Sequence, residues 1–162
     1  MDWNRLRDEF PITRNYNFMN HAAASPLCRR SVEAMHLYLK HAEENAYLRG
    51  GFFKQVDRVR LQLANLINAN PDEIAFTKNT SEGISFVANG LNWQNGDNVV
   101  ITNVEFPANV YPWQALRSSG VQVRMVMEED GRIPIESLLE TINNRTRVVS
   151  ISSVQFVSGY RS

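Results

Sequence analysis

The sequence predicts an α/β protein, with a mostly parallel sheet and flanking helices that follow a helical segment. Two patterns favour this fold class. Residues 1–70 contain long stretches in which apolar side chains recur at three and four positions, the period of an amphipathic helix. From residue 71 onward, short apolar runs alternate with helical patterns, which is typical of strands joined by crossover helices. The chain is therefore divided into an N-terminal helical segment, 1–70, and an α/β part, 71–162.

Three helices are expected in the helical segment. They cover residues 2–10, 27–48 and 52–68. Pro11 ends the first helix, because proline has no backbone donor and fixes its own φ. Gly50 and Gly51 separate the other two helices, and residues 16–19 form a brief extended segment.

The α/β part is expected to contain four strands and three helices. The strands cover residues 74–77, 98–102, 121–126 and 147–152, and the helices cover residues 81–91, 112–119 and 134–142. Pro112 suits the first turn of its helix, and Gly120 can end that helix. The apolar run at residues 148–153 is typical of a central, buried strand.

A polar turn, Asn79-Thr80-Ser81, lies between the first of these strands and the helix that follows it. The first N–H groups of a helix lack internal partners and carry partial positive charge, so they can hold an anion. The hydroxyl groups of Thr80 and Ser81 can add donors to a bound phosphate. The same residues are also ordinary helix N-caps, so the turn alone leaves both interpretations open.

A second polar segment, TNVEFPANVYPW at residues 102–113, follows the next strand. Ligands of an open parallel sheet bind outside the carboxyl ends of its strands, so the two polar segments are expected to face one site. In that site the turn would hold a phosphate, and the ring of Phe106 could cover a flat heterocycle.

With YNFMNHAAASP at residues 16–26 ahead of them, these motifs resemble the class V aminotransferase family. The family consists of fold-type I pyridoxal-phosphate enzymes and includes cysteine desulfurases, kynureninases and isopenicillin N epimerase-like proteins. The resemblance extends from Tyr16 to Gly159, and its motifs are specific to the family rather than to one member. It implies that residues 71–162 are the front part of an incomplete fold-type I large domain, without its remainder or the C-terminal small domain.

The resemblance also implies binding roles for residues of these motifs. The phosphate contacts are Asn79, Thr80 and Ser81, the cofactor-stacking residue is Phe106, the contact near the pyridine hydroxyl is Gln155, and the substrate-facing turn is Asn20, His21, Ala22 and Ala23. Simpler roles remain open from the residues themselves: Phe106 as a core aromatic, Gln155 as a solvated strand end and His21 as a structural turn residue.

Two departures from the family pattern bear on the chemistry. Cysteine desulfurases usually carry histidine at the stacking position, whereas Phe106 has no titratable nitrogen, which argues against desulfurase chemistry. The family's Schiff-base lysine, its aspartate partner and the arginine for the substrate carboxylate correspond to positions beyond residue 162. The three lysines present, Lys40, Lys54 and Lys78, match no Schiff-base position, so no catalytic residue is expected in this segment.

The composition excludes several other classes of protein. With 43% hydrophobic residues, 21% charged residues and a formal net charge of +0, the chain shows no sign of a nucleic-acid partner. A single cysteine, Cys28, excludes an internal disulfide and favours a reducing compartment. No apolar run approaches the roughly 20 residues of a membrane span, and the first residues lack the apolar core of a signal peptide. We expect a cytoplasmic protein with no membrane partner and no bound metal.

Together, the residues and the resemblance predict the N-terminal part of a homodimeric, pyridoxal-phosphate-dependent enzyme that acts on an amino acid through an aldimine. The abrupt end after the last strand indicates a natural truncation or a fragment, and this segment alone is expected to be inactive. Two alternatives remain open. The chain could be a non-catalytic α/β domain that binds a phosphate-bearing ligand, or it could be a dimerisation module.

Overall fold

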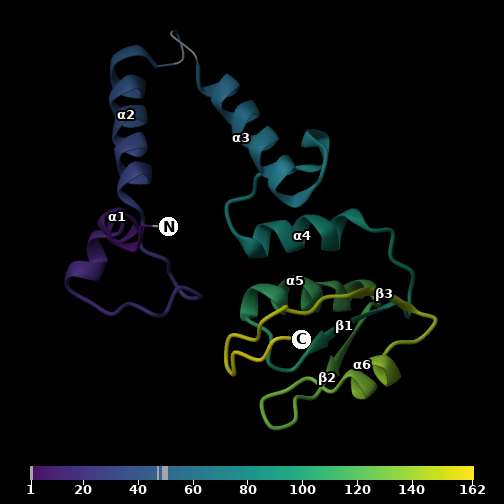
Figure 1. The fold of residues 1–162 in the computed structure, drawn as a ribbon. Helices are drawn as coiled ribbons and strands as arrows, with labels where there is room; N and C mark the ends of the chain where they lie inside the picture. Colours follow the sequence, from purple (N-terminus) through teal and green to yellow (C-terminus); the bar gives the residue numbers. More distant parts are fainter. Residues whose placement is uncertain (1, 47, 49–50) are drawn as a thin grey trace. The chain divides into compact units, whose positions relative to one another are not determined.

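Two compact units make up the chain in the computed structural model, which describes residues 2–46, 48 and 51–162. The first unit is Met1–Ile74 and the second is Ala75–Ser162. Figure 1 shows helices in the first unit and a sheet with flanking helices in the second. Within the described residues, no helix has the length and apolarity that a membrane span requires.

The first unit is built from helices. They are α1 (Trp3–Asp8), α2 (Arg29–Asn45) and α3 (Phe52–Ile67), with short 3-10 helices at Pro11–Arg14 and Pro71–Glu73. Asp2 caps α1, because its carboxylate accepts the backbone N–H groups of Asn4 and Arg5 at 3.1 and 3.2 Å. The three predicted helices are therefore present, with shorter ends. The predicted break at Gly50, and residue 47 of the second predicted helix, lie outside the described residues.

The second unit contains a three-stranded sheet in the order β2-β1-β3. The strands are β1 (Asn98–Thr102), β2 (Gln122–Val126) and β3 (Thr146–Val149), and the α-helices are α4 (Thr80–Gly90), α5 (Tyr111–Gln114) and α6 (Ile135–Thr141). β1 pairs in parallel with both of its neighbours, so the carboxyl ends of all three strands meet at one edge. This arrangement confirms the predicted α/β class with a parallel sheet.

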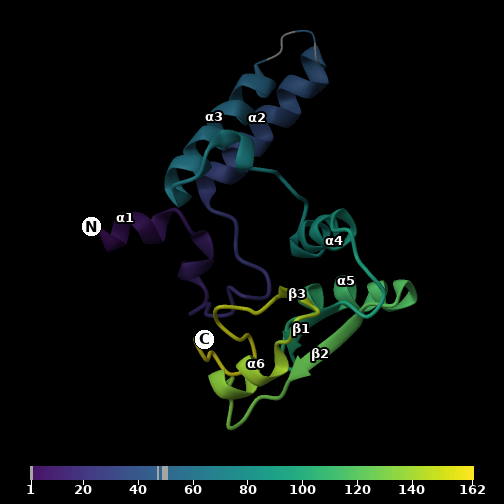
Figure 2. The same cartoon turned by 90° about the vertical axis from the view of Figure 1, so that its right-hand side faces the viewer.

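Helices cover both faces of the sheet, as Figure 1 and Figure 2 show together. Val99 and Ile101 of β1 pack on one face against Ala88 of α4 and Trp113 of α5. Val100 packs on the opposite face, in a cluster that α6 covers. Successive side chains of a strand point to opposite faces, so a strand covered on both sides is apolar throughout its middle. All five residues of β1 are buried accordingly.

Two of the predicted strands differ from the structure. The strand predicted at residues 74–77 is wrong, since these residues pair with no strand among the described residues. Extended backbone becomes a strand only where a neighbour supplies the ladder hydrogen bonds. The central position predicted for the run at 148–153 is also wrong, because β3 ends at Val149 and lies at the edge of the sheet. Val149 is 44% exposed there, and β1 takes the central place.

The helix predicted at residues 112–119 is present but changes type along its length. α5 passes into a 3-10 helix, Ala115–Ser119, which ends at Gly120. Gly120 has a φ of 80°, in the left-handed region, and its N–H donates to the carbonyl of Arg117 at 3.0 Å. Glycine reaches this region without a Cβ penalty, so the predicted role of Gly120 is confirmed.

Candidate functional site

The predicted phosphate turn forms the start of α4. Asn79 is the N-cap residue, and its side-chain oxygen accepts the backbone N–H of Glu82 at 2.9 Å. Thr80 and Ser81 occupy the first two helical positions and are exposed. Their backbone N–H groups have no acceptor among the described residues, as is usual for the first turn of a helix. Asn79 is thus committed to capping, whereas Thr80 and Ser81 are free to donate to an anion.

All three lysines of the chain are exposed, on α2, on α3 and beside this turn. The Lys78 ammonium lies 3.2 Å from the carboxylate of Glu82, which also accepts the backbone N–H of Lys78 at 2.7 Å. The Lys78 side chain is 84% exposed, so this ion pair is well solvated. The partial charge of the α4 N-terminus, rather than Lys78, is therefore the local attraction for an anion.

A buried carboxylate that the sequence analysis gave no role organises the carboxyl edge of the sheet. Glu105 follows β1 and is 6% exposed. Its two oxygens accept hydrogen bonds from the side chains of Thr102 (3.3 Å), Asn109 (3.0 Å), Ser152 (2.6 Å) and Gln155 (3.1 Å), and from the backbone N–H of Ser152 (2.8 Å). These five contacts saturate a carboxylate, which offers about four lone-pair positions. Glu105 thereby connects the end of β1 to the segment that follows β3.

The hydrogen bonds to Glu105 also set its protonation. Burial raises the pKa of the Glu105 carboxyl, but the donors from Ser152, Asn109 and Gln155 lower that pKa by more. The net pKa lies below the ordinary value of 4.5, so Glu105 is ionised at neutral pH. An ionised carboxylate can only accept hydrogen bonds, which fixes the direction of every bond in the network.

Asn109 holds the loop after β1 against the end of β3. Its side-chain nitrogen donates to Glu105 and to the carbonyl of Ser150, at 3.0 and 3.1 Å. Its side-chain oxygen accepts the indole N–H of Trp113 at 3.0 Å and the hydroxyl of Ser150 at 2.6 Å. Asn109 is 8% exposed and has all its hydrogen-bonding positions occupied, so it holds the loop after β1 and the end of β3 in a fixed arrangement.

Gln155 is buried, with only 1% exposure, so its interpretation as a solvated strand end is wrong. Its side-chain nitrogen donates to Glu105 at 3.1 Å and to the carbonyl of Ser152 at 3.4 Å. Its side-chain oxygen is buried and has no partner among the described residues. A buried acceptor without a donor is costly, and such groups in native proteins often face a ligand or water.

Phe106 makes a second contact between the segment after β1 and the segment after β3. Its ring meets the ring of Phe156 edge to face, with centroids 5.2 Å apart and an interplanar angle of 87°. Phe106 is 49% exposed, so it is not a core aromatic, and part of its ring surface remains open. α4 contacts the 3-10 helix Pro107–Asn109, which begins directly after Phe106. The structure therefore brings the phosphate helix, Phe106 and Gln155 into one part of the second unit.

The predicted substrate turn belongs to the first unit, whereas the residues above belong to the second. Asn20 and Ala23 are joined by a backbone hydrogen bond of 3.4 Å, and all four residues of the turn are exposed. The His21 ring packs edge to face on Phe18, with centroids 5.1 Å apart. This contact supports a local structural role for His21.

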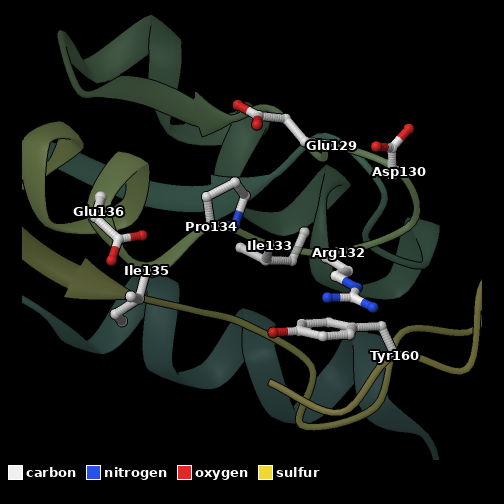
Figure 3. A pocket seen from close by; sticks show the side chains of 8 residues that line it. All are labelled: Glu129, Asp130, Arg132, Ile133, Pro134, Ile135, Glu136 and Tyr160. Carbon is white, nitrogen blue, oxygen red and sulfur yellow. The ribbon is translucent and has the colours of Figure 1, made fainter.

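A cavity of about 630 Å³ lies elsewhere in the second unit, beside α6 (Figure 3). Its lining includes the carboxylates of Glu129, Asp130 and Glu136, together with Arg132 and Tyr160. Three carboxylates against one guanidinium disfavour an anionic ligand. None of the predicted site residues lines this cavity, so the candidate site stays at the carboxyl edge of the sheet.

The fold of this chain is shared with solved structures of pyridoxal-phosphate enzymes. A complex of the cystine C-S lyase C-DES with its reaction product cysteine persulfide is 23% identical, with a TM-score of 0.85 over 94% of this chain and 42% of that one. The apo cysteine desulfurase from Thermococcus onnurineus NA1 is 26% identical, with a TM-score of 0.77 over 94% of this chain and 40% of that one. These similarities confirm the predicted fold-type I architecture, of which this chain contains a part.

Sequence comparison defines the family. The family model for aminotransferase class-V matches residues 16–162, so the chain belongs to the class V aminotransferase family. Class V aminotransferases use pyridoxal phosphate. The family assignment that the motifs suggested is thereby confirmed.

Curated relatives are considerably longer than this chain. A probable cysteine desulfurase of Methanothermobacter thermautotrophicus (strain Delta H) is 34% identical over 161 residues, which are 95% of this chain and 40% of the relative. A cysteine desulfurase of Enterobacter sp. (strain 638) is 32% identical over 174 residues, 96% of this chain and 42% of the relative. The chain thus spans less than half the length of the curated relatives that it matches.

Proposed function

We propose that this chain is the cofactor-anchoring part of a pyridoxal-phosphate-dependent enzyme that acts on an amino acid. The observation that carries the proposal is the joining of Phe106 to Gln155 at the carboxyl edge of the sheet, through Glu105 and Phe156. In parallel sheets this edge is where ligands bind. A half-exposed aromatic ring at this edge, close to polar side chains, suits a flat heterocycle that carries a polar substituent.

The residues at this edge fit the cofactor group by group. The N–H groups and hydroxyls of Thr80 and Ser81 would hold the phosphate at the N-terminus of α4, where Asn79 acts as the cap. Phe106 would cover one face of the pyridine ring, and Gln155 would contact its hydroxyl. When bound, pyridoxal phosphate supplies an electron sink for carbanion chemistry at the amino-acid substrate.

The choice of reaction depends on the residue that faces the ring. Phe106 offers a stacking surface but cannot accept or donate a proton, so any proton transfer needs a different group. We therefore propose a reaction other than cysteine desulfuration, although the relatives described above are cysteine desulfurases. The Schiff-base lysine and the acid that pairs with the ring nitrogen would lie in the remainder of the gene product.

Three further features complete the proposal. The turn at Asn20, His21, Ala22 and Ala23 would face the substrate. The enzyme would be a cytoplasmic homodimer. The chain would consist of a helical segment at residues 1–70, followed by the front part of the cofactor-binding domain at residues 71–162.

Titration of pyridoxal phosphate into the complete gene product that contains this chain tests the proposal. Thr80→Ala combined with Ser81→Ala should weaken binding at least about tenfold, since charge-assisted hydrogen bonds contribute roughly 1.5–3 kcal/mol each. Ser118→Ala combined with Ser119→Ala, a matched change at exposed positions away from the site, should leave affinity unchanged. Equal affinities of the wild type and the Thr80/Ser81 variant would refute the phosphate assignment.

A further inference from the structure

The chain contains two Asn-Gly pairs, Asn89-Gly90 and Asn95-Gly96. Asparagine before glycine is chemically labile, because the next backbone nitrogen can attack the side-chain carbon Cγ and glycine has no side chain to obstruct it. A bond forms between that nitrogen and Cγ, and the side-chain amide leaves as ammonia with the proton of the nitrogen. Water then opens the cyclic imide to aspartate or isoaspartate. The reaction therefore requires a backbone N–H group that is released from its hydrogen bond.

Asn89 is held at both of the groups that must react. It lies in the last turn of α4, and its side-chain nitrogen donates to the carbonyl of Ser85 at 2.8 Å. Gly90 is the last residue of α4, so its N–H group belongs to the hydrogen-bond ladder of the helix. Deamidation at Asn89 requires the release of both the side chain and the backbone.

Asn95 is held at only one of these groups. Its side chain is exposed and makes no hydrogen bond among the described residues. The side-chain amide lies against Gly120, where an added Cβ would collide with it. The N–H group of Gly96, which is the nucleophile, donates to the carbonyl of Gly120 at 3.0 Å. This contact lies just before β1 and β2 begin, at the opposite edge of the sheet from the candidate cofactor site.

We propose that Asn95 is a site of spontaneous deamidation in the folded protein, and that the hydrogen bond from Gly96 to Gly120 sets its rate. The reaction follows local opening of this bond, so its rate is that of a free peptide multiplied by the open fraction. Isoaspartate lengthens the main chain by one carbon, directly before the carbonyl of Asp97 that accepts the N–H of Gln122 at 2.9 Å. Deamidation therefore loosens the start of the pairing between β1 and β2.

The two Asn-Gly pairs provide an internal comparison. The complete gene product is incubated at mildly alkaline pH, in buffer and in denaturant, and the two sites are followed by peptide mass spectrometry. In denaturant both sites should react at similar rates, because each is then a free Asn-Gly peptide. In buffer Asn95 should react about three- to tenfold faster than Asn89, the value of the one additional hydrogen bond that holds Asn89. No reaction at Asn95 in buffer, or one no faster than at Asn89, overturns the proposal.

Gly120→Ala tests the contact itself. The added methyl group displaces the Asn95 side chain and weakens the bond from Gly96, so Asn95 should react about three- to tenfold faster than in wild type. Gly90→Ala is the matched control, since a Cβ there meets nothing within 4 Å, and it should leave the rate at Asn95 unchanged. An unchanged rate at Asn95 in Gly120→Ala, or an equal increase in Gly90→Ala, overturns the proposed role of the hydrogen bond.

Hydrogen exchange of the Gly96 N–H group keeps the proposal testable if Gly120→Ala does not fold. Low concentrations of urea promote local opening in the wild type, and exchange of this N–H group and deamidation of Asn95 follow the same opening. Both rates should therefore increase by the same factor as urea is added. A rate of deamidation at Asn95 that does not change with the exchange of Gly96 overturns the proposal.

Discussion

The carboxylate of Glu105 accepts a hydrogen bond of 3.1 Å from the side-chain amide of Gln155, fifty positions further along the chain. The residues that follow each of them, Phe106 and Phe156, meet ring to ring at 5.2 Å. Two consecutive contacts thus fasten the loop after β1 to the segment after β3. This pair of contacts holds the half-exposed Phe106 ring and the buried Gln155 side chain on two adjoining segments at the carboxyl edge of the sheet.

The stability of the fold should depend on the ionisation of Glu105. Its folded pKa lies below the ordinary 4.5, because the donors around the carboxylate outweigh its desolvation. The ionised carboxylate therefore stabilises the fold fully above the unfolded pKa, and this contribution is lost as pH falls through the folded pKa. The difference in melting temperature between wild type and Glu105→Gln should be largest at neutral pH and shrink below about pH 5. A difference that stays constant across this range would contradict the assignment.

Replacement of Asn109 by alanine should destabilise the second unit. The change removes the acceptor of the Trp113 indole N–H and of the Ser150 hydroxyl, which both donate to the Asn109 side-chain oxygen. Trp113 is buried, and a buried donor left without a partner costs about 1–3 kcal/mol, so the free energy of unfolding should fall by roughly that amount. Asn144→Ala, at an exposed position, should change it by less than about 0.5 kcal/mol. Chemical denaturation of the two variants, with similar losses for both, would show that the Asn109 network contributes little.

Phe106→Ala should lose pyridoxal phosphate more readily than Phe106→His or Phe106→Tyr. A flat ring preserves a stacking surface, and aromatic pairs add roughly 0.5–1.5 kcal/mol beyond burial. Cofactor retained after dialysis can be followed by its absorbance. Retention by Phe106→Ala equal to that of wild type would mean that Phe106 does not stack on the cofactor.

A related prediction concerns the release of sulfide from cysteine. Phe106 carries no titratable nitrogen, so the complete gene product should release little or no sulfide from cysteine. Phe106→His, which restores a proton carrier at this position, provides the comparison. Robust sulfide release by wild type would contradict the proposed choice of reaction.

Gly120→Ala should destabilise the fold, whereas Gly90→Ala should not. Gly120 has a φ of +80°, and a Cβ added there would collide with the side-chain oxygen of Asn95. Gly90 lies at the end of α4, and a Cβ there would meet nothing within 4 Å. Alanine exceeds glycine in helix propensity by up to about 1 kcal/mol, so Gly90→Ala should be neutral or stabilising. Equal melting temperatures for the two variants would rule out the strain expected at Gly120.

Residues 1–162 produced by themselves should self-associate and form no cofactor adduct. β3 is an edge strand with one partner, and an unpaired edge is a template for another chain. The three lysines are exposed and match no Schiff-base position, so borohydride reduction should trap no pyridoxal phosphate. Sedimentation and mass spectrometry check both points. A monodisperse monomer with a stoichiometric adduct on Lys40, Lys54 or Lys78 would relocate the active-site lysine to this segment.

The sequence was sufficient to predict the elements that depend on residues close together in the chain, such as helices and their ends. The helical periods of residues 27–48 and 52–68 gave α2 and α3, and Gly120 ended its helix as expected. The strand predicted at 74–77 failed because an apolar run does not say whether a partner strand is present. The run at 148–153 likewise gave no sign of its place at the edge of the sheet.

The binding site was only partly predictable for the same reason. The motif containing Phe106 and the turn at Thr80 and Ser81 are visible in the sequence, because each is a local pattern after a strand. The role of Glu105 was missed, since the partners that define it, Ser152 and Gln155, lie 47 and 50 positions away. An acidic residue in a polar segment is normally solvated, and nothing in the sequence distinguishes a buried one. Only the fold brings these groups together.

The central claim is that the N-terminus of α4, Phe106 and Gln155 anchor one molecule of pyridoxal phosphate. A crystal structure of the complete gene product with the cofactor bound tests it most directly. We expect the phosphate on the N–H groups of Thr80 and Ser81, the pyridine ring against Phe106, and the ring hydroxyl within hydrogen-bonding distance of the Gln155 side chain. Cofactor bound away from α4, or with Phe106 and Gln155 out of contact, would contradict it.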